Sequence, residues 1–267
     1  MKMPDIGLGT FRLKGEDAFN SVKQGLELGY RHIDTAQIYD NEAEIGKALQ
    51  QSDVPRENIF ITTKIWTDSL EKEKLLPSLH ESLRKLQTSY VDLTLIHWPS
   101  PNKEVPLEET LQELMKAKEL GLTREIGISN FPMSETKRAL EIVGAKNIFT
   151  NQVEVHPFLQ NRKLIEFCKS QGVHITAYMP LAYGKVMKEP TLLSLAEKHK
   201  VSAADVALSW LLEQELAVIP SSTKKENLQK NLKTPRRFLS KEDMAAIAAL
   251  NNGERLANPG FAPEWDV

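Results

Sequence analysis

Four polar residues lie where apolar or β-branched stretches of the chain end, and as a set they could protonate a carbonyl oxygen. They are Asp34, Tyr39, Lys64 and His97. Burying such groups is costly, so their positions favour a functional role. A phenol has an ordinary pKa of about 10, too high for easy proton donation near neutral pH. A protonated Lys64 beside Tyr39 would lower the pKa of the phenol, and Asp34 would keep the amine charged and oriented.

His97 follows the apolar stretch 93–96. A histidine with one donor nitrogen facing a pocket can orient a substrate carbonyl oxygen. Taken singly, each residue of the set has a commoner explanation: an exposed loop tyrosine, a lysine whose stem lies along the surface, an aspartate that caps a helix, and a hydrogen-bonded core histidine. The chemical interpretation therefore depends on the four side chains meeting in one place.

Short apolar runs alternate along the chain with longer amphipathic stretches. The predicted strands lie near residues 7–9, 30–34, 59–65, 91–97, 124–128, 148–153, 173–178 and 216–220. The predicted helices, with apolar positions three and four apart, include 71–86, 107–120, 134–143 and 161–171. Eight strand-then-helix units predict an α/β fold, a single (β/α)8 TIM barrel domain over residues 1–267 with additional helices and loops at its C-terminal face. An open doubly wound sheet is the second choice.

Loops and helix starts support this order. Prolines follow the fourth predicted strand (Pro99, Pro101, Pro106) and the seventh (Pro180, Pro190). They mark long loops at the C-terminal ends of strands, the face on which barrel active sites lie. Ser202, followed three residues later by Asp205, is typical of a capped helix start.

Composition narrows the range of partners. Hydrophobic residues make up 41% and charged residues 26% of the 267 residues, and the net charge is −2 without a basic block. We therefore expect a small-molecule partner and no nucleic acid. No apolar stretch is long enough for a membrane span or a secretory signal, which predicts a cytoplasmic protein. The one cysteine, Cys168, cannot form an internal disulfide and is expected to be packed in a helix and chemically quiet.

Common cofactor motifs are missing from the sequence. Gly7-Leu-Gly9 continues as Thr10-Phe11, so it is not the usual Gly-x-Gly-x-x-Gly dinucleotide fingerprint. The six histidines do not group with cysteines or carboxylates at metal-ligand spacing. We expect no metal site, and a nucleotide would have to be bound in another way.

The chain resembles the aldo-keto reductase family. The matching strings are Gly7-Leu-Gly-Thr-Phe11, Ile33-Asp-Thr-Ala-x-x-Tyr39, Thr63-Lys-Ile-Trp66, Leu95-Ile-His-Trp-Pro99, Ile126-Gly-Ile-Ser-Asn-Phe131, Asn151-Gln-Val-Glu-Val-His-Pro157 and Ile219-Pro-Ser-Ser-Thr223. They run through nearly the whole chain in the family's order. Within the family the chain is similar to short bacterial reductases that act on 2,5-diketo-D-gluconate and on small α-oxo aldehydes such as methylglyoxal.

The resemblance implies NADPH-dependent reduction of small aldehydes and ketones to alcohols, by an NADP-dependent oxidoreductase. Tyr39 would be the general acid, Lys64 and Asp34 its tuning pair, and His97 the group that positions the carbonyl. A reduced nicotinamide would supply the hydride, since no protein side chain can. The substrate would lie against His97 and the aromatic residues Phe11, Trp66 and Trp98. Relatives of this size are often monomers, so we expect a monomer.

The resemblance also implies a cofactor site. Tyr178 would stack on the nicotinamide, and Ser129, Asn130 and Gln152 would bind its carboxamide. The full set of implied cofactor residues is Thr10, Phe11, Asp34, Ser129, Asn130, Gln152, Tyr178, Leu181, Ser221, Ser222, Thr223, Lys224, Asn227 and Asn231. The stretch 221–231 would hold the adenosine phosphate at a helix start. Without the resemblance, Tyr178 reads as a core aromatic, Asn130 as a turn residue, and the basic helix start as solvated.

Some positions depart from the family pattern. Many relatives have lysine and arginine where this chain has Ser221 and Asn227, so Lys224 and Lys225 are expected to replace them, and NADPH is still favoured over NADH. Met179 replaces a serine that meets the pyrophosphate, at a modest cost. The chain begins almost at the first strand, so the barrel floor must be closed in another way than by the usual amino-terminal hairpin. The short carboxyl-terminal tail favours small polar substrates.

Two other functions compete with carbonyl reduction. Lys64 near a barrel strand end could form a Schiff base, as in an aldolase-like lyase. Alternatively the fold could bind a nucleotide as a sensor or partner module, as some family members do for channels. The intact set of four polar residues argues against the second alternative.

Overall fold

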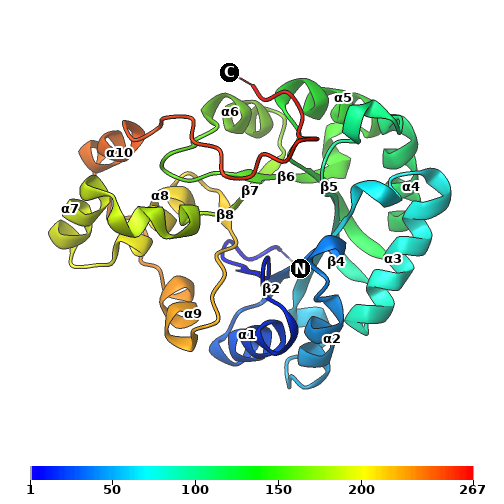
Figure 1. Ribbon diagram of the computed structural model, residues 1–267, viewed down its shortest axis with the longest axis horizontal. Coiled ribbons are helices and arrows are strands. Elements are labelled where there is room, and N and C mark those ends of the chain that lie inside the picture. Colours follow the sequence, from blue (N-terminus) through cyan, green and yellow to red (C-terminus); the bar gives the residue numbers. More distant parts are fainter. Residues whose placement is uncertain (1, 267) are drawn as a thin grey trace.

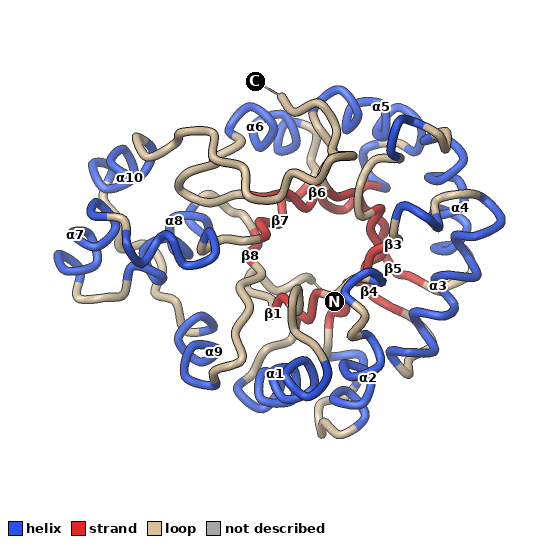
Figure 2. Tube along the Cα trace, in the orientation of Figure 1, coloured by secondary structure: helices blue, strands red, loops and turns tan. Residues whose placement is uncertain are grey.

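Eight parallel strands follow one another around a ring in chain order, and each is hydrogen-bonded to the next. The computed structural model describes residues 2–266. Its strands are β1 (Leu8–Gly9), β2 (His32–Asp34), β3 (Phe60–Ile65), β4 (Val91–Ile96), β5 (Thr123–Ser129), β6 (Ile148–Glu154), β7 (His174–Tyr178) and β8 (Ala217–Val218). All eight strands predicted from the sequence are present, and Figure 2 shows them as the red inner ring.

The sheet closes on itself, which distinguishes it from the open doubly wound alternative. Ile6 pairs with Val218 in a parallel bridge. The Gly7 amide donates to the Val218 oxygen at 2.8 Å, and the Val218 amide donates to the Asp5 oxygen at 2.8 Å. These bonds join the first and last strands, so the (β/α)8 barrel prediction is confirmed.

Helices surround the ring (Figure 1). They are α1 (Gly15–Leu28), α2 (Glu42–Gln50), α3 (Lys72–Leu86), α4 (Leu107–Glu119), α5 (Met133–Val143), α6 (Arg162–Ser170), α7 (Pro190–His199), α8 (Ala203–Glu213), α9 (Lys225–Leu232) and α10 (Lys241–Ala248). The four helices predicted by periodicity, α3 to α6, agree with the structure to within one residue at each end. The predicted start of α8 is also confirmed, because Ser202 and Asp205 form a reciprocal capping box.

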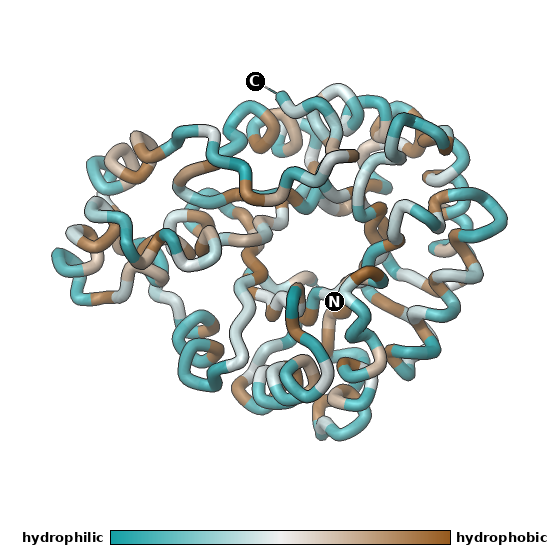
Figure 3. The backbone as a smooth tube through the Cα atoms, viewed as in Figure 1, coloured by the Kyte–Doolittle hydropathy of each residue, from teal (hydrophilic) through white to brown (hydrophobic). Residues whose placement is uncertain are grey.

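Apolar spacing explains which helix faces meet the strands. In α3, Leu75, Leu79 and Leu83 recur every four residues and all are buried. All six residues of β3 and all six of β4 are buried, as expected for strands covered on both faces. Figure 3 shows the same alternation as brown stretches that recur along the helices. Cys168 is buried in α6, and burial raises the pKa of its thiol to about 12, which keeps it in the unreactive protonated form.

The amino-terminal ends of the strands are closed by the chain's own side chains. A separate apolar cluster there contains Met3, Phe60, Leu93, Leu95, Ala217 and the partly buried Phe149. The Phe60 ring lies 6.1 Å from that of Phe149 and 5.3 Å from that of His32, centroid to centroid. Met3 and these rings therefore form the barrel floor that the sequence left unexplained. None of the helices in residues 2–266 has the length and apolar character needed to cross a bilayer.

Candidate active site

The four polar residues predicted from the sequence meet at the C-terminal ends of neighbouring strands. Asp34 ends β2, Lys64 is the fifth residue of β3, and His97 follows β4 directly. Tyr39 ends a short helical turn, Gln37–Tyr39, that follows β2. Because parallel strands direct their carboxyl ends to one side, the alternation of strands and helices is sufficient to gather these residues.

The Lys64 amine is enclosed by three acceptors. Its Nζ donates to Asp34 Oδ1 at 2.6 Å and to the Thr35 carbonyl oxygen at 2.7 Å, and it lies 3.5 Å from Tyr39 Oη. Lys64 is fully buried and does not border the cavity described below. An ammonium has three protons, so these contacts account for all of them. A carbonyl compound in the cavity cannot reach this amine without disrupting the ion pair, which disfavours the Schiff-base alternative.

The pKa of Tyr39 is shifted in the direction opposite to the one expected from the sequence. Removal from solvent, followed by the negative charge of Asp34, raises the pKa of the Tyr39 phenol well above its ordinary value. Burial is the larger cause, and Asp34 adds to it because its carboxylate, 2.6 Å from Lys64 Nζ, offsets the positive charge that would otherwise favour the phenolate. Burial disfavours the charged form of the amine too, and it therefore lowers the pKa of Lys64. Tyr39 therefore rests as a neutral phenol.

Asn41 holds the loop that carries Tyr39, a role that the sequence analysis missed. Its Oδ1 accepts from the Thr35 hydroxyl at 2.7 Å, and its Nδ2 donates to the Thr10 and Leu13 oxygens, both at 2.9 Å. The side chain is 1% exposed, so these bonds are not shared with water. Sequence offered only a weak signal, an asparagine two residues after Tyr39.

His97 is neutral and packs edge-on between two aromatic rings. The centroid of its ring lies 5.6 Å from that of Tyr39 and 5.2 Å from that of Trp66. Burial, and then the charge of Lys64, lowers the pKa of His97 well below its ordinary value. A neutral imidazole has one donor and one acceptor nitrogen, as the positioning role requires. Its Nδ1 is buried without a hydrogen-bond partner among the described residues.

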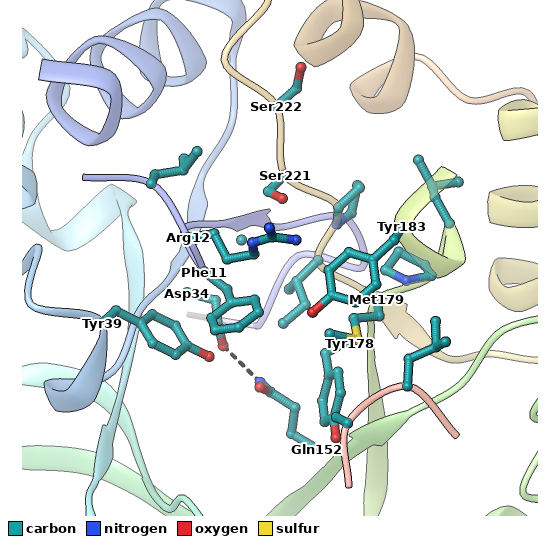
Figure 4. Close-up of a pocket in the computed structure, with 18 of the residues that line it drawn as sticks. Phe11, Arg12, Asp34, Tyr39, Gln152, Tyr178, Met179, Tyr183, Ser221 and Ser222 are labelled. Atoms are coloured by element: carbon teal, nitrogen blue, oxygen red, sulfur yellow. Dashed lines mark hydrogen bonds between the residues drawn. The ribbon is translucent and has the colours of Figure 1, made fainter. Parts of the chain in front are cut away.

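Amide and hydroxyl groups from β5, β6 and β7 adjoin the four polar residues. Gln152 Nε2 donates to the second oxygen of Asp34 at 2.7 Å, the dashed line in Figure 4. Tyr178 Oη donates to Asn130 Oδ1 at 2.7 Å, and Asn130 Nδ2 donates to the His97 carbonyl oxygen at 3.0 Å. The Ser129 hydroxyl donates to the Gln152 carbonyl oxygen at 2.7 Å. The residues predicted to bind a carboxamide thus form one network with Asp34 and His97.

A cavity of about 1080 Å³ connects this network to the segment 221–222 and to one face of α9. It is bordered by fifteen residues proposed from the sequence, namely Phe11, Asp34, Tyr39, Trp66, His97, Trp98, Ser129, Asn130, Gln152, Tyr178, Leu181, Ser221, Ser222, Asn227 and Asn231. Three of the expected cofactor residues, Thr10, Thr223 and Lys224, do not border it. Thr10 is fully buried, and its hydroxyl donates to the Asp34 carbonyl oxygen at 2.9 Å.

The cationic residues around the cavity differ from those expected. Lys225 forms an ion pair with Glu27 at 3.6 Å and does not border the cavity, whereas Lys230, which was not predicted, does. A helical signal was present, because Lys230 follows Asn227 by three residues and therefore shares its face. Arg12 also borders the cavity, and its guanidinium lies 5.1 Å from the Tyr183 ring centroid. Figure 4 shows Arg12 and Tyr183 reaching toward each other above Phe11 and Tyr178.

Exposed apolar side chains gather at the same opening. Phe11, Ile38, Tyr183 and Met187 are 43%, 47%, 52% and 44% exposed, and all four border the cavity. Clustered exposed apolar groups are typical of a binding surface. Elsewhere in the described part of the chain, no cluster of three histidine, cysteine, aspartate or glutamate side chains could hold a metal.

Comparisons with known proteins agree with this geometry. A family model described as the aldo/keto reductase family matches residues 5–252. The chain is 57% identical over 267 residues to methylglyoxal reductase DkgB of Escherichia coli O157:H7, covering 100% of both chains. It is 40% identical over 261 residues to glyoxal reductase of Bacillus subtilis (strain 168), covering 97% of this chain and 93% of that one. A solved structure assigned as a 2,5-diketo-D-gluconic acid reductase B superposes with a TM-score of 0.95 at 41% identity, covering 99% of this chain and 94% of that one.

Proposed function

The chain belongs to the aldo/keto reductase family, and on that premise we propose that it reduces small aldehydes and ketones to alcohols with NADPH as the hydride donor. The observation that carries the proposal is the contact set of Lys64, whose amine joins the Asp34 carboxylate to the Tyr39 phenol. This arrangement places one protonated acid at the wall of a cavity that also holds a neutral histidine.

The residues around the cavity fit a dinucleotide together with a small carbonyl compound. The volume of about 1080 Å³ is slightly above the usual range for ligand pockets, roughly 300 to 1,000 Å³. The amide groups of Asn130 and Gln152 and the ring of Tyr178 suit a nicotinamide carboxamide and ring. Ser221, Ser222 and the helix α9 suit the phosphate groups at the other end. When bound, NADPH supplies the hydride that adds to the carbonyl carbon.

Proton transfer is the part of the reaction that this chain's own residues perform. Tyr39, neutral at rest, donates its proton to the carbonyl oxygen as the hydride reaches the carbon, so that the product is a neutral alcohol. The resulting phenolate lies 3.5 Å from the Lys64 ammonium, whose charge the Asp34 carboxylate largely offsets. His97 orients the carbonyl oxygen toward Tyr39. A high pKa of Tyr39 is compatible with its acid role, because the alkoxide left by hydride addition is a stronger base than a phenolate and takes the proton.

We propose small α-oxo aldehydes such as methylglyoxal, and sugar ketones such as 2,5-diketo-D-gluconate, as substrates. The walls nearest His97 and Tyr39 are aromatic, from Phe11, Trp66 and Trp98. The test is a panel of aldehydes and sugar ketones assayed with NADPH and NADH in parallel, following loss of reduced nicotinamide. Failure to reduce any of these compounds, despite tight NADPH binding, would instead support a nucleotide-binding module.

We further propose that Lys230 supplies the charge that favours NADPH over NADH. It borders the cavity beside Asn227 and Asn231 and forms no ion pair with a residue in the described part of the chain. A charge-assisted hydrogen bond at this exposed position is worth about 1 kcal/mol, so Lys230→Met should raise the KM for NADPH about fivefold and leave that for NADH unchanged.

The matched control for this proposal is Lys225→Met. This lysine is on the same helix but pairs with Glu27 outside the cavity. It should leave both KM values unchanged, since the same loss of charge occurs away from the cofactor. Equal effects of the two variants, or no effect of Lys230→Met, would contradict the assignment.

We expect one barrel domain that acts as a cytoplasmic monomer with no nucleic-acid or membrane partner. The continuous ring of strands from β1 to β8 supports a single unit. Light scattering at micromolar concentration, cell fractionation and a single cooperative unfolding transition are the corresponding measurements.

A further inference from the structure

A carboxylate that the proposed mechanism does not use lies buried beside the site. Glu154 ends β6 and its side chain is 0% exposed. Its Oε1 lies 2.7 Å from His156 Nε2 and accepts from the Leu256 amide at 2.8 Å, while its Oε2 accepts from the Ala257 amide at 2.8 Å. Burying a carboxylate is costly unless hydrogen bonds compensate, and two of these three come from one distant segment.

That segment, residues 255–266, is called the strap here. In Figure 1 it is the red segment that runs along the upper edge of the barrel opening, past β7 and β6, from the side of α10 toward α5. Besides the Glu154 contacts, it is held at its far end, where the Asp266 carboxylate accepts from the Met133 amide at 2.8 Å, at the start of α5. The strap contains no helix or strand of its own, so its position depends on contacts with the rest of the chain, of which these two attachments and the aromatic contacts of Phe261 and Trp265 are the main ones.

The strap borders the cavity and also packs behind two of its aromatic lining residues. Leu256, Ala257 and Pro259 border the cavity directly. The Phe261 ring lies 5.8 Å from the Trp66 ring and 5.7 Å from the Trp98 ring, both in edge-on contact. Trp66 in turn contacts the His97 ring at 5.2 Å. A continuous chain of contacts therefore leads from the strap to the side chain that positions the carbonyl.

We infer that Glu154 is a positioning residue that holds the strap in register, so that Phe261 supports Trp66 and Trp98, the aromatic wall of the substrate side, and keeps the cavity small enough to select for small carbonyl compounds. The inference rests on the proposed function and refines its substrate class. Glu154 touches neither substrate nor cofactor in this scheme; it acts through Leu256, Ala257 and then Phe261. A carboxyl side chain suits this position because two backbone amides donate to it, one to each oxygen, and a carboxylate accepts at both oxygens.

Glu154→Gln tests the attachment with little change in shape. The glutamine NH2 group would face the Leu256 amide in one orientation and the Ala257 amide in the other, so at least one hydrogen bond is replaced by a donor–donor contact. The expected result is a rise of about tenfold in the KM for methylglyoxal with kcat within about twofold, since a wall contributes equally to ground-state and transition-state binding. NADPH affinity should stay unchanged, and bulky aromatic aldehydes should become relatively better substrates.

A double-mutant cycle separates this role from a general loss of stability. Phe261→Ala alone should raise the KM for methylglyoxal by a similar factor. In the Phe261→Ala background, Glu154→Gln should add less than about twofold, because both changes remove the same wall. A full additional effect in that background would overturn the inference, as would an unchanged KM in Glu154→Gln. Glu141→Gln, an exposed position on α5, is the matched control for loss of one carboxylate.

A second readout is independent of catalysis. Trypsin cleavage after Arg255, next to the Leu256 amide that Glu154 holds, should be about tenfold faster in Glu154→Gln than in the parent protein and in Glu141→Gln, because local opening exposes that bond. If Glu154→Gln fails to fold, Ala257→Pro removes one donor to Oε2 and leaves the contact with His156 intact; it should accelerate the same cleavage. Parent protein that reduces no carbonyl compound would refute the proposed function, whereas cleavage rates unchanged in these variants would refute the anchoring role of Glu154.

Discussion

Replacing Tyr39 with phenylalanine removes the proposed proton donor and very little else. Among residues 2–266, the Tyr39 hydroxyl has one side-chain hydrogen-bond partner, Lys64 Nζ at 3.5 Å, which is at the long limit of a hydrogen bond. The ring contacts with Phe11 and His97, at centroid distances of 5.2 Å and 5.6 Å, do not involve the hydroxyl. The loss of folding stability should therefore be below about 1 kcal/mol, whereas loss of a positioned general acid costs about 10²- to 10⁴-fold in rate.

The expected fall in kcat corresponds to about 3 to 5 kcal/mol of transition-state stabilisation. It should appear in methylglyoxal reduction followed through NADPH consumption, while the dissociation constant for NADPH, measured by fluorescence titration, stays within about threefold. The contrast between a large loss of rate and unchanged binding distinguishes proton donation from a packing role. A Tyr39→Phe enzyme that retains more than about a tenth of the parent kcat would refute the assignment of Tyr39 as the acid.

Two other predictions follow from the same geometry. The neutral phenol is the active form for reduction, and burial together with Asp34 raises the pKa of Tyr39. Within the range where the fold is stable, kcat should therefore stay constant up to pH values above the ordinary phenol pKa of about 10 and fall only beyond them. A decline in kcat centred near neutral pH that vanishes in Tyr39→Phe would contradict this prediction. Asn41→Ala removes the side chain that fixes the Tyr39 loop and leaves buried groups unpaired. It should lower the free energy of unfolding by about 1 to 3 kcal/mol, measured by urea denaturation, and should also lower kcat, measured by steady-state kinetics. An unchanged kcat would show that the loop keeps its position without Asn41.

Local patterns were sufficient to predict most of the fold. Strand and helix periodicities are properties of neighbouring residues, which is why all eight strands and the four named helices were placed nearly correctly. The gathering of Asp34, Lys64 and His97 also followed, because each stands at the C-terminal end of a strand and parallel strands direct those ends to one side. For these features the tertiary structure had little left to decide.

Other properties depended on contacts between distant parts of the chain. The direction of the Tyr39 pKa shift followed from burial and from the 2.6 Å ion pair between Lys64 and Asp34, neither of which is a local property of the sequence. The choice between Lys225 and Lys230 depended on the face of α9 that meets the cavity. The attachment of the strap to Glu154 joins residues about a hundred positions apart, 102 for the Leu256 amide.

The sequence alone thus determined which residues could do the chemistry and the order of elements that brings them together, since both are written in residue type and local spacing. Only the tertiary structure decided how acidic the phenol is, which lysine faces the cavity, what closes the floor of the barrel and what covers its opening. Those properties arise from distances and solvent exclusion between segments that are far apart in the chain.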